Sequence, residues 1–481
     1  MSQWASCDGA HEIAEKHKHG DPYVDQSAET LNQHFTPLSH SYPVFMQRFW
    51  FLFYNFLIIP GFWLLVQLGA LFNPKIRRGI QGRKGLLDRI ELEAKQLTGA
   101  RRFWFHSSSM GEFEQAKPII AELRKRYHDI DIIVSFFSPS GYEHSRNYKP
   151  ADLITYLPFD TVGNARRFLD LIKPTIAIMV RYDIWPNHIW ELHKRGIPIV
   201  IANATMRKSS SRYYPFLRSF HRDVYEQITS ILTVSQGDVD AFQDFGLKNP
   251  ELHVVGETRY DQVWQRSLEA KTRHLIPAAI LKRKKVFVVG SSWDEDEAVL
   301  LPAFRRIAQH DSNALMILVP HEPTLPTLER LELALNYAMR SIRFSDLNDY
   351  SNENVVLVDS IGILMSLYQY ADVAYVGGSF RQGIHNVLEP AVYGIPVLYG
   401  PKHENSQEAM ELARRGGSLV ITNAEECYLQ LRKMLNDKKA RLRAGAESLR
   451  LVQENVGATE RFIEYLETAV RKERPPLSTP G

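Results

Sequence analysis

The longest uninterrupted hydrophobic segment of this 481-residue chain lies near its N-terminus. From Phe49 to Phe72 the sequence reads FWFLFYNFLIIPGFWLLVQLGALF, without one charged residue in 24 positions. A helix of that length can cross a bilayer. The segment begins too far along the chain for a typical signal peptide, and it has no small-residue cleavage site. We therefore predict a membrane-anchor segment over residues 43–78.

The interior of this segment leaves three structures open. Pro60 and Gly61 interrupt it, and Asn55 and Gln67 are polar, so it could lie bent in the membrane interface instead of crossing. It could also be a buried core helix. Basic residues follow it between positions 75 and 84, whereas the stretch before it is acid-rich. The positive-inside rule then places the large C-terminal part in the cytoplasm, where the basic residues can meet an anionic membrane surface.

Beyond the anchor segment, short apolar runs alternate with stretches of helical periodicity. A helix is predicted to end at Tyr127 after beginning at Glu112, and a later helix runs from Pro186 to Arg195. Alternation of this kind indicates βαβ units and a parallel sheet. The strands predicted in the first half of the chain are Arg102–His106, Ile130–Phe137, Thr175–Val180, Ile197–Ile201, Ile231–Val234 and His253–Val255.

The alternation pauses between Gln265 and Lys284, a stretch that is helical or linker-like, and then begins again. We therefore predict an α/β protein with two Rossmann-like, doubly wound domains that face a cleft, over residues 79–270 and 271–470. Residues 1–42 are expected to form a poorly ordered polar extension, and residues 471–481 a tail. The strands predicted in the second domain are Val286–Val289, Leu315–Val319, Val355–Val358, Val373–Val376, Val397–Leu398 and Ser418–Ile421.

Composition is that of a globular protein and excludes several classes of function. With 44% hydrophobic and 23% charged residues, the chain has enough apolar mass for two cores. The formal net charge is only +3, so we predict no nucleic-acid partner. The two cysteines, Cys7 and Cys427, have no metal-ligand spacing and form no disulfide framework. We expect neither a metal nor a cofactor.

The first predicted strand ends in HSSSMGE, residues 106–112. Ligands of open parallel sheets bind beyond the carboxyl ends of the strands, so this loop is a candidate site. Gly111 lets another molecule approach the backbone closely. Glu112 would face the cleft and could take a proton from an incoming hydroxyl group. The alternative is a glutamate that only stabilises the start of a helix through the macrodipole, and position alone does not decide between the two.

The first strand of the second domain ends in Gly290-Ser291-Ser292-Trp293. Backbone N–H groups and a hydroxyl at a strand–helix turn suit a phosphate. The alternative is an ordinary N-cap, which position alone favours slightly.

The strongest candidate site is a glycine-rich loop, VGGSFRQGIHNVLEP, over residues 376–390. Its three glycines let the loop pack against a ligand. His385, Asn386 and Glu389 cluster at the start of one helix, where a donor can meet a phosphate and a carboxylate can accept from ribose hydroxyls. The alternative is a capping box with Asn386 as the N-cap and Glu389 three residues later. A capping box explains two of these residues but not the glycines.

Together these motifs resemble one family closely, the 3-deoxy-D-manno-octulosonic acid (Kdo) transferases of lipopolysaccharide synthesis. The similarity extends from about Met46 to about Glu467 and includes the hydrophobic anchor. The motifs, which occur in the family's order and spacing, are HSSSMGE (106–112), SPSGYE (138–143), LPFDT (157–161), DIWPN (183–187), IANATM (201–206), GETRYD (256–261), GSSWDEDE (290–297) and GGS (377–379) followed by GIHNVLEPAVYGIPVLYGP (383–401).

The resemblance implies a GT-B fold and the transfer of Kdo from CMP-Kdo to a lipid A precursor, with inversion, at the cytoplasmic face of the inner membrane. It assigns Glu112 as the general base that deprotonates the acceptor hydroxyl. The leaving group carries one phosphate, so no metal need bridge a diphosphate, and we expect residues 294–296 to open a helix. The implied donor-binding residues are Ser291, Ser292, His321, Gly378, Ser379, His385, Asn386 and Glu389. The implied acceptor-binding residues are Ser109, Gly111, Arg181 and Asp183.

Two positions depart from the family's pattern. Many members have Glu-Thr-Glu where this chain has Arg181-Tyr182-Asp183. Our hypothesis is that Arg181 faces a phosphate of the lipid acceptor and that Asp183 keeps the remaining acidic role. Many members also have Pro-Arg-His where this chain has Pro320-His321-Glu322, which replaces a permanently charged phosphate contact by a titratable one. We therefore expect activity to fall as pH rises and this histidine loses its proton.

Two other functions stay open because a fold does not fix a function. One is a GT-B enzyme that uses a UDP-sugar, or an epimerase on the same scaffold. The other is a non-catalytic, sugar-nucleotide-binding membrane protein. The presence of Glu112 beside a full set of expected CMP contacts argues against the second of these.

Overall fold

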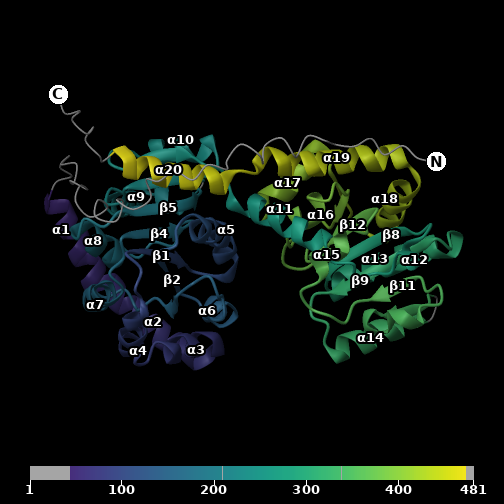
Figure 1. Ribbon diagram of the computed structural model, residues 1–481, viewed down its shortest axis with the longest axis horizontal. Coiled ribbons are helices and arrows are strands. Elements are labelled where there is room, and N and C mark those ends of the chain that lie inside the picture. The colour runs from purple at the N-terminus through teal and green to yellow at the C-terminus, as the bar shows by residue number, and fades with distance from the viewer. Residues whose placement is uncertain (1–43, 208–209, 337–338, 473–481) are drawn as a thin grey trace.

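The computed structural model describes residues 44–207, 210–336 and 339–472. Its two lobes are each built on a parallel sheet of seven strands, with a hydrophobic core on both faces of each sheet (Figure 1). This arrangement confirms the predicted α/β, doubly wound class. The polar extension predicted over residues 1–42 and positions 473–481 of the tail lie outside the described residues.

The strand order of the first lobe is β3-β2-β1-β4-β5-β6-β7, with every neighbouring pair parallel. The strands are β1 (Arg101–Ser107), β2 (Ile130–Phe136), β3 (Leu153–Tyr156), β4 (Ile176–Val180), β5 (Ile199–Ala204), β6 (Ser230–Thr233) and β7 (Glu251–Val254). The helices are α3 (Pro74–Gly82), α4 (Leu86–Glu93), α5 (Met110–Arg126), α6 (Pro139–Ser145), α7 (Val162–Ile172), α8 (Pro186–Lys194), α9 (Pro215–Tyr225) and α10 (Gln236–Asp244). The strand order reverses between β1 and β4, which is where ligands bind in such sheets.

The second lobe repeats this plan with the strand order β10-β11-β9-β8-β12-β13-β14. The strands are β8 (Lys285–Ser292), β9 (Ala314–Pro320), β10 (Ser341–Arg343), β11 (Val355–Leu357), β12 (Val373–Val376), β13 (Val397–Tyr399) and β14 (Ser418–Val420). The helices are α12 (Ala278–Leu281), α13 (Asp294–His310), α14 (Leu325–Asn336), α15 (Leu364–Tyr368), α16 (Leu388–Ala391), α17 (Gln407–Arg415), α18 (Ala424–Asn436) and α19 (Lys438–Asn455).

Burial on both faces explains why these strands are continuous apolar runs. All seven residues of β2 and all seven of β9 are buried, as expected where helices cover both sides of a parallel sheet. Every predicted strand is present. Each sheet also gains one edge strand that was not predicted, β3 and β10.

Two helices join the lobes. Helix α11 (Thr258–Lys271) packs against α5 in the first lobe and against α15, α16 and α19 in the second. Helix α20 (Ala458–Lys472) follows α19 and lies over the first lobe (Figure 1). It buries Phe462, Ile463 and Leu466 in the core that contains β1 and β2. The last helix thus completes the first lobe, although its residues fall within the range expected for the second domain.

The hydrophobic segment near the N-terminus is one long helical run from Phe45 to Phe72. It consists of α1 (Val44–Phe53), a π-helical segment (Tyr54–Ile58) and α2 (Ile59–Phe72). The interruption expected at Pro60 does not occur, because the wider turn directly before it accommodates a residue without an N–H group. Only 11% of its most hydrophobic window is buried, so the core-helix alternative is wrong. The helix is long and apolar enough to cross a membrane.

One face of this helix is attached to the first lobe by specific contacts. The Tyr54 hydroxyl donates to Asp160 Oδ2 over 2.8 Å. The side chains of Asn55 and Asn187 exchange two hydrogen bonds of 3.0 and 2.9 Å. Trp50 is only 2% exposed and packs edge-on against aromatic rings of α9. The polar Asn55, which interrupts the apolar sequence, is therefore a docking residue.

Candidate active site

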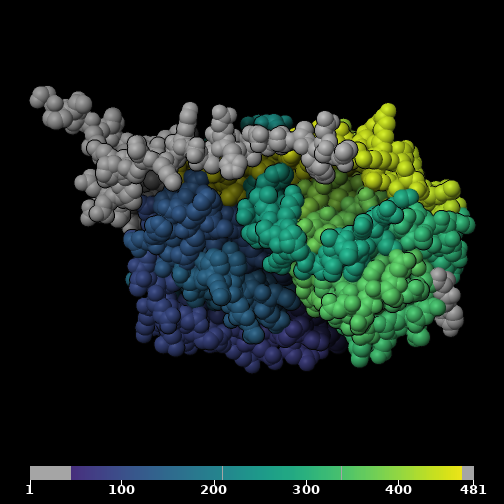
Figure 2. All heavy atoms as spheres, turned by 45° about the vertical axis from the view of Figure 1, so that its right-hand side comes forward, coloured from purple at the N-terminus to yellow at the C-terminus, as the bar shows by residue number. Residues whose placement is uncertain are grey.

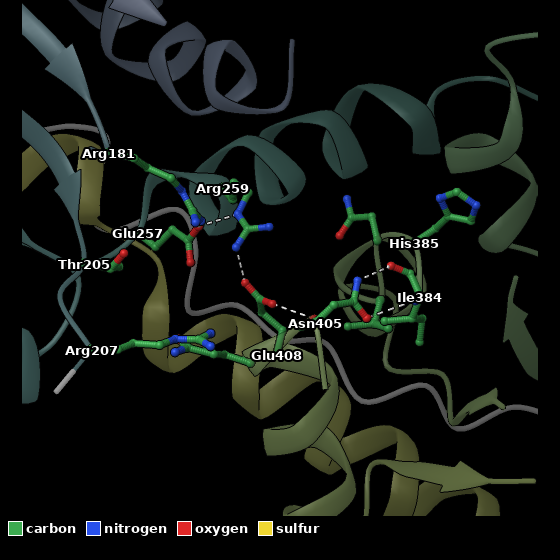
Figure 3. Close-up of a pocket in the computed structure, with 13 residues that line it drawn as sticks. Arg181, Thr205, Arg207, Glu257, Arg259, Ile384, His385, Asn405 and Glu408 are labelled. Carbon is green, nitrogen blue, oxygen red and sulfur yellow. Dashed lines mark hydrogen bonds and ion pairs between the residues drawn. The ribbon is translucent and has the colours of Figure 1, made fainter. Parts of the chain in front are cut away.

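A cavity of about 250 Å³ lies between the lobes. In Figure 2 the blue first lobe and the green second lobe stand side by side with a hollow between them, and Figure 3 shows side chains from both lobes around the cavity. The lining residues are Arg181, Thr205, Arg207, Glu257, Arg259, Ile384, His385, Asn386, Val387, Asn405, Ser406, Gln407 and Glu408. Of the predicted site residues, Arg181, His385 and Asn386 line this cavity. The others lie at the carboxyl ends of strands in the two lobes.

Glu112 is held at the start of α5 by a capping box. Ser109 is the N-cap, and its hydroxyl accepts from the Glu112 N–H over 3.5 Å. In return, Glu112 Oε2 accepts from the N–H groups of Ser108 at 2.6 Å and Ser109 at 3.2 Å. Its other oxygen, Oε1, has no partner within the described part of the chain. Glu112 therefore stabilises the start of the helix with one carboxylate oxygen and keeps the other available.

Two carboxylates at the switch point have opposite pKa shifts. Burial raises the pKa of Glu112, and the negative charge of Asp183 raises it further, against the lowering effect of the backbone hydrogen bonds. Burial would also raise the pKa of Asp183, but hydrogen bonds from His106, Trp185 and Ser108 outweigh it and lower that pKa. At a given pH, Glu112 therefore holds a proton more readily than Asp183 does.

His106, at the end of β1, orients Asp183. Its Nε2 lies 2.7 Å from Asp183 Oδ2, and its Nδ1 lies 2.9 Å from Ser135 Oγ. Trp104 donates to the same Ser135 oxygen over 2.8 Å. Because the ionised Asp183 only accepts, the His106 Nε2 carries a hydrogen. His106 was part of the predicted loop motif but was given no role; a histidine near the carboxyl end of a buried strand was the available signal.

Arg181 follows β4 in the left-handed region, with φ of 64°. Its guanidinium lies 2.9 Å from Glu257 Oε1 and donates to Gln115 over 3.1 Å. Glu257 also pairs with Arg259, which in turn pairs with Glu408 of the second lobe. Charges of alternating sign thus run across the boundary between the lobes, as Figure 3 shows.

The two serines after β8 lie in different environments. Ser291 is half-buried and has φ of 54°, in the left-handed region. Ser292 is buried, and its hydroxyl donates to Glu297 over 2.9 Å. Glu297 is paired at 2.7 Å with Arg330 of α14. The turn therefore leaves Ser291 partly exposed while Ser292 holds the turn in place.

Helix α13 begins at Asp294, as the sequence suggested for the acidic run. Its third residue, Asp296, is fully buried and accepts three hydrogen bonds. They come from the Trp293 N–H at 3.0 Å, the Gly378 N–H at 2.8 Å and the Tyr375 hydroxyl at 2.7 Å. Asp296 therefore ties the glycine-rich loop to the start of α13, a role that the sequence did not reveal.

The glycines of the loop are required by close contact with the protein itself. A Cβ on Gly377 would clash with the Ser291 carbonyl, and one on Gly378 would clash with the Gly383 carbonyl and lie 3.0 Å from the His385 ring. Gly378 also has φ of 94°. The hydroxyl of the fully buried Ser379 accepts from the Gly400 N–H over 2.6 Å. The loop is thereby fixed before any ligand binds.

Asn386 and Glu389 do not form the capping box that was considered for them. Helix α16 begins at Leu388 with Val387 as its N-cap. Asn386 Oδ1 accepts from the Leu388 N–H over 3.1 Å, and its amide group lies 3.4 Å from Glu389 Oε1. Burial raises the pKa of Glu389, while Arg266 of α11 lowers it.

His321, Trp293 and His385 form one aromatic cluster at the ends of β9, β8 and β12. The His321 ring is stacked on Trp293 at 4.2 Å and on His385 at 4.8 Å. The Arg381 guanidinium lies 4.3 Å from the Trp293 ring centroid. The predicted residues His321 and His385 are therefore brought together, with two neighbours that were not predicted.

Comparison with known proteins supports the family resemblance. Residues 79–262 match a family model described as 3-deoxy-D-manno-octulosonic-acid transferase (kdotransferase). The 3-deoxy-D-manno-octulosonic acid transferase of Haemophilus influenzae is 27% identical over 431 residues, which cover 87% of this chain and 98% of that protein. The enzyme of the same name from Aquifex aeolicus is 29% identical over 341 residues, 70% of this chain and 86% of that protein.

Solved structures confirm the fold. The UDP-GlcNAc 2-epimerase of Neisseria meningitidis, bound to UDP-GlcNAc, aligns with a TM-score of 0.53 and 14% identity over 76% of this chain and 100% of that one. At this identity the likeness concerns the arrangement of the two lobes alone. The family match, the curated relatives and the two-lobed fold agree. The chain is a glycosyltransferase that closely resembles the 3-deoxy-D-manno-octulosonic acid transferases.

Proposed function

We propose that this protein transfers Kdo from CMP-Kdo to a lipid A precursor, with inversion at the anomeric carbon. The observation that carries the proposal is the Glu112 carboxylate at the switch point of the first sheet. Its Oε2 is fixed by two backbone N–H groups, and its Oε1 has no partner among the described residues. A base with one anchored and one available oxygen can remove the proton of an acceptor hydroxyl as that hydroxyl attacks.

Asp183 supports this base as a fixed negative charge. Its hydrogen bond to His106 keeps it ionised, and its charge raises the pKa of Glu112, which makes Glu112 a stronger proton acceptor. Ser109 and Gly111 lie on the same turn and would contact the acceptor sugar. A Cβ built on Gly111 meets nothing within 4 Å, so the space beside this residue is open.

Arg181 would meet a phosphate of the acceptor. In the unliganded chain it is paired with Glu257, so a phosphate would have to replace that carboxylate or bind beside it. Arg207 and Arg259 line the same cavity and add positive charge. A polyanionic acceptor suits these arginines, because guanidinium groups bind phosphate oxygens in pairs.

The second lobe would bind the donor. Ser291, Ser292, His321, Gly378, Ser379, His385, Asn386 and Glu389 would form the CMP site. Within it, Ser292 and Ser379 would act by holding the two turns, since their hydroxyls are bonded to Glu297 and Gly400. His321, His385 and Arg381 would face the phosphate on which negative charge develops as CMP leaves.

The N-terminal helix would bring the enzyme to a lipid acceptor at the cytoplasmic face of the inner membrane. Its outward residues are large and exposed, including Phe56, Leu64, Leu65, Leu68 and Phe72. The basic helix α3 follows directly, as expected for a segment next to an anionic membrane surface.

The proposal is tested by giving the purified full-length protein a lipid A precursor and either CMP-Kdo or a UDP-sugar, and weighing the lipid product by mass spectrometry. We expect a mass increase of one or more Kdo residues with CMP-Kdo only. Transfer from the UDP-sugar, or CMP-Kdo consumption without a heavier lipid, would contradict the proposal. A product with retained anomeric configuration would contradict the inverting mechanism.

A further inference from the structure

Trp293 and His385 lie side by side and are joined by one hydrogen bond. The indole Nε1 is 3.0 Å from His385 Nε2, and the two rings are nearly parallel, at 14°, with centroids 6.4 Å apart. The atoms Cδ2 and Nε2 of His385 also pack against Gly378, where a Cβ would approach them to 3.0 and 3.1 Å. The orientation of the imidazole is therefore set from two sides.

This contact determines which nitrogen of His385 carries its hydrogen. An indole N–H can only donate, so the Nε2 of His385 must accept. A doubly protonated imidazolium has no acceptor, and the Nε2–H tautomer has none at this position. His385 is therefore neutral with its hydrogen on Nδ1. Nδ1 has no hydrogen-bond partner within residues 44–207, 210–336 and 339–472, so this hydrogen is available to a ligand.

The charged groups around His385 come from several elements. His321, which follows β9, is stacked on it at 4.8 Å. Asp296 of α13 accepts from the N–H of Gly378, the residue that packs against the ring, and Arg381 on the glycine-rich loop is paired with Glu295 at 3.9 Å. Burial lowers the pKa of His385, His321 lowers it further, and Asp296 raises it. The net effect agrees with the neutral form that the hydrogen bond requires.

We propose that Trp293 is a positioning residue that fixes His385 as a neutral imidazole whose Nδ1–H is donated to the phosphate of the bound nucleotide. Arg381 then supplies positive charge, and His385 supplies a directed hydrogen bond. This inference rests on the proposed donor site in the second lobe. Without the indole N–H, the imidazole of His385 could carry its hydrogen on either nitrogen and could take up a second proton.

The test compares wild type with Trp293→Phe, which keeps an aromatic ring beside His321 and Arg381 but removes the N–H. CMP affinity of the full-length proteins is measured by calorimetry between pH 5.5 and 8. The same pair is made in a His321→Arg background, where the neighbouring imidazole no longer titrates. At pH 8 we expect CMP binding about 10-fold weaker in Trp293→Phe, from the loss of one directed hydrogen bond. At pH 5.5 the difference should shrink to about 3-fold or less, because His385 can now become a cation.

A loss of affinity that is equal at every pH would show that Trp293 only fills space, and it would overturn the proposal. Unchanged affinity would do the same. A second measurement is made on the wild type: the ¹⁵N chemical shifts of the histidine side chains, with His385 assigned by comparison with His385→Asn. We expect the neutral Nδ1–H form at every pH in this range. An imidazolium or an Nε2–H tautomer would overturn the inference. If wild type bound UDP but not CMP, the proposed function would fail, whereas the tautomer measurement would still test whether Trp293 positions His385.

Discussion

Breaking the ion pairs between the lobes should destabilise the protein by an amount that depends on pH. Arg259 of α11 joins Glu257 of the first lobe to Glu408 of the second, and each of these carboxylate side chains is only 7% exposed. Glu257 also has Arg181 at 2.9 Å, whereas Glu408 would keep no ion pair at this distance, only hydrogen bonds from the Ser406 hydroxyl and its own backbone N–H and the weaker attraction of Arg181. Replacing Arg259 by methionine, which retains an aliphatic stem, should therefore leave Glu408 as the unpaired buried charge.

The magnitude follows from the burial of the pair. Removing one partner of a buried ion pair costs about 3–5 kcal/mol. We expect about 3 kcal/mol near pH 7.5, the lower end, because the Arg259 side chain is 32% exposed. Burial would raise the pKa of Glu408, but Arg259 outweighs it and lowers that pKa in the wild type. In the variant only the Ser406 hydroxyl, the backbone N–H of Glu408 and the charge of Arg181 still oppose burial, so we expect the pKa of Glu408 to lie above its wild-type value.

The change in the pKa of Glu408 makes the loss of stability depend on pH. In the wild type, the contribution of Glu408 is present above its unfolded pKa and is lost as pH falls through the lowered folded value. In Arg259→Met the folded pKa lies higher, so this contribution is reduced, and the reduction grows as pH rises and the carboxyl group ionises. The loss of stability in Arg259→Met relative to the wild type should therefore be largest near pH 7.5 and small near pH 4.5.

Scanning calorimetry of the full-length protein at these two pH values measures this difference. Arg414→Met is the control, because its pair with Glu411 lies on the surface of the second lobe, and it should leave the melting temperature unchanged at both pH values. A deficit below about 1 kcal/mol at pH 7.5, or one of equal size at both pH values, would refute the reasoning.

Three further predictions concern the first lobe. Gly111→Ala has open space for its methyl group and should leave the protein folded, or stabilise α5 by up to about 0.5 kcal/mol. If Gly111 contacts the acceptor, the KM for the lipid rises several-fold while CMP binding is unchanged. An unchanged KM removes Gly111 from the acceptor site. Asp183→Asn removes the charge that raises the pKa of Glu112, so the acid limb of the kcat/KM profile should move to lower pH, and a limb that stays or moves upward contradicts this coupling. Asn55→Leu removes the paired hydrogen bonds to Asn187 and should weaken docking of the N-terminal helix by about 1 kcal/mol, seen as faster backbone hydrogen exchange in α1; Gln67→Leu is the matched control without that contact, and equal exchange in both variants would count against docking.

The architecture could be predicted from the sequence because each central strand is a continuous apolar run between helical stretches. The two strands that were missed, β3 and β10, each lie at one edge of a sheet. In β10 (SIR) all three residues are only half-buried and one alone is apolar, so it has no apolar run, and β3 (LITY) is a run of only four residues. Helix α20 shows a different limit, since its amphipathic pattern predicts a buried face but not which of the two lobes buries it.

Of the candidate site, only the residues within local sequence motifs could be predicted. Glu112, His385 and Asn386 lie in motifs after strands, and they could be named from position and resemblance. Asp296 and Glu408 could not, because their roles arise from contacts with residues far away in the sequence. Asp296 is bonded to Gly378, 82 positions later, and Glu408 is paired with Arg259, 149 positions earlier.

Pro60 shows that a local rule can fail where the chain adapts. A proline inside a helix removes one hydrogen bond and is expected to bend or end it. Here the π-helical turn of Tyr54–Ile58 directly precedes it, and the helix continues to Phe72. The same turn places Tyr54 and Asn55 against the first lobe, so the irregular segment is also the docking segment.

The central claim is that Glu112 removes a proton from the acceptor while the second lobe holds CMP-Kdo. The most direct test is Glu112→Gln, which keeps a side chain of the same size and removes the base. With CMP-Kdo and a lipid A precursor, the account predicts that kcat falls at least about 100-fold, while the affinity for CMP stays within about two-fold of wild type, as expected for a residue of the other lobe. Transfer of Kdo at the wild-type rate by Glu112→Gln would contradict the account.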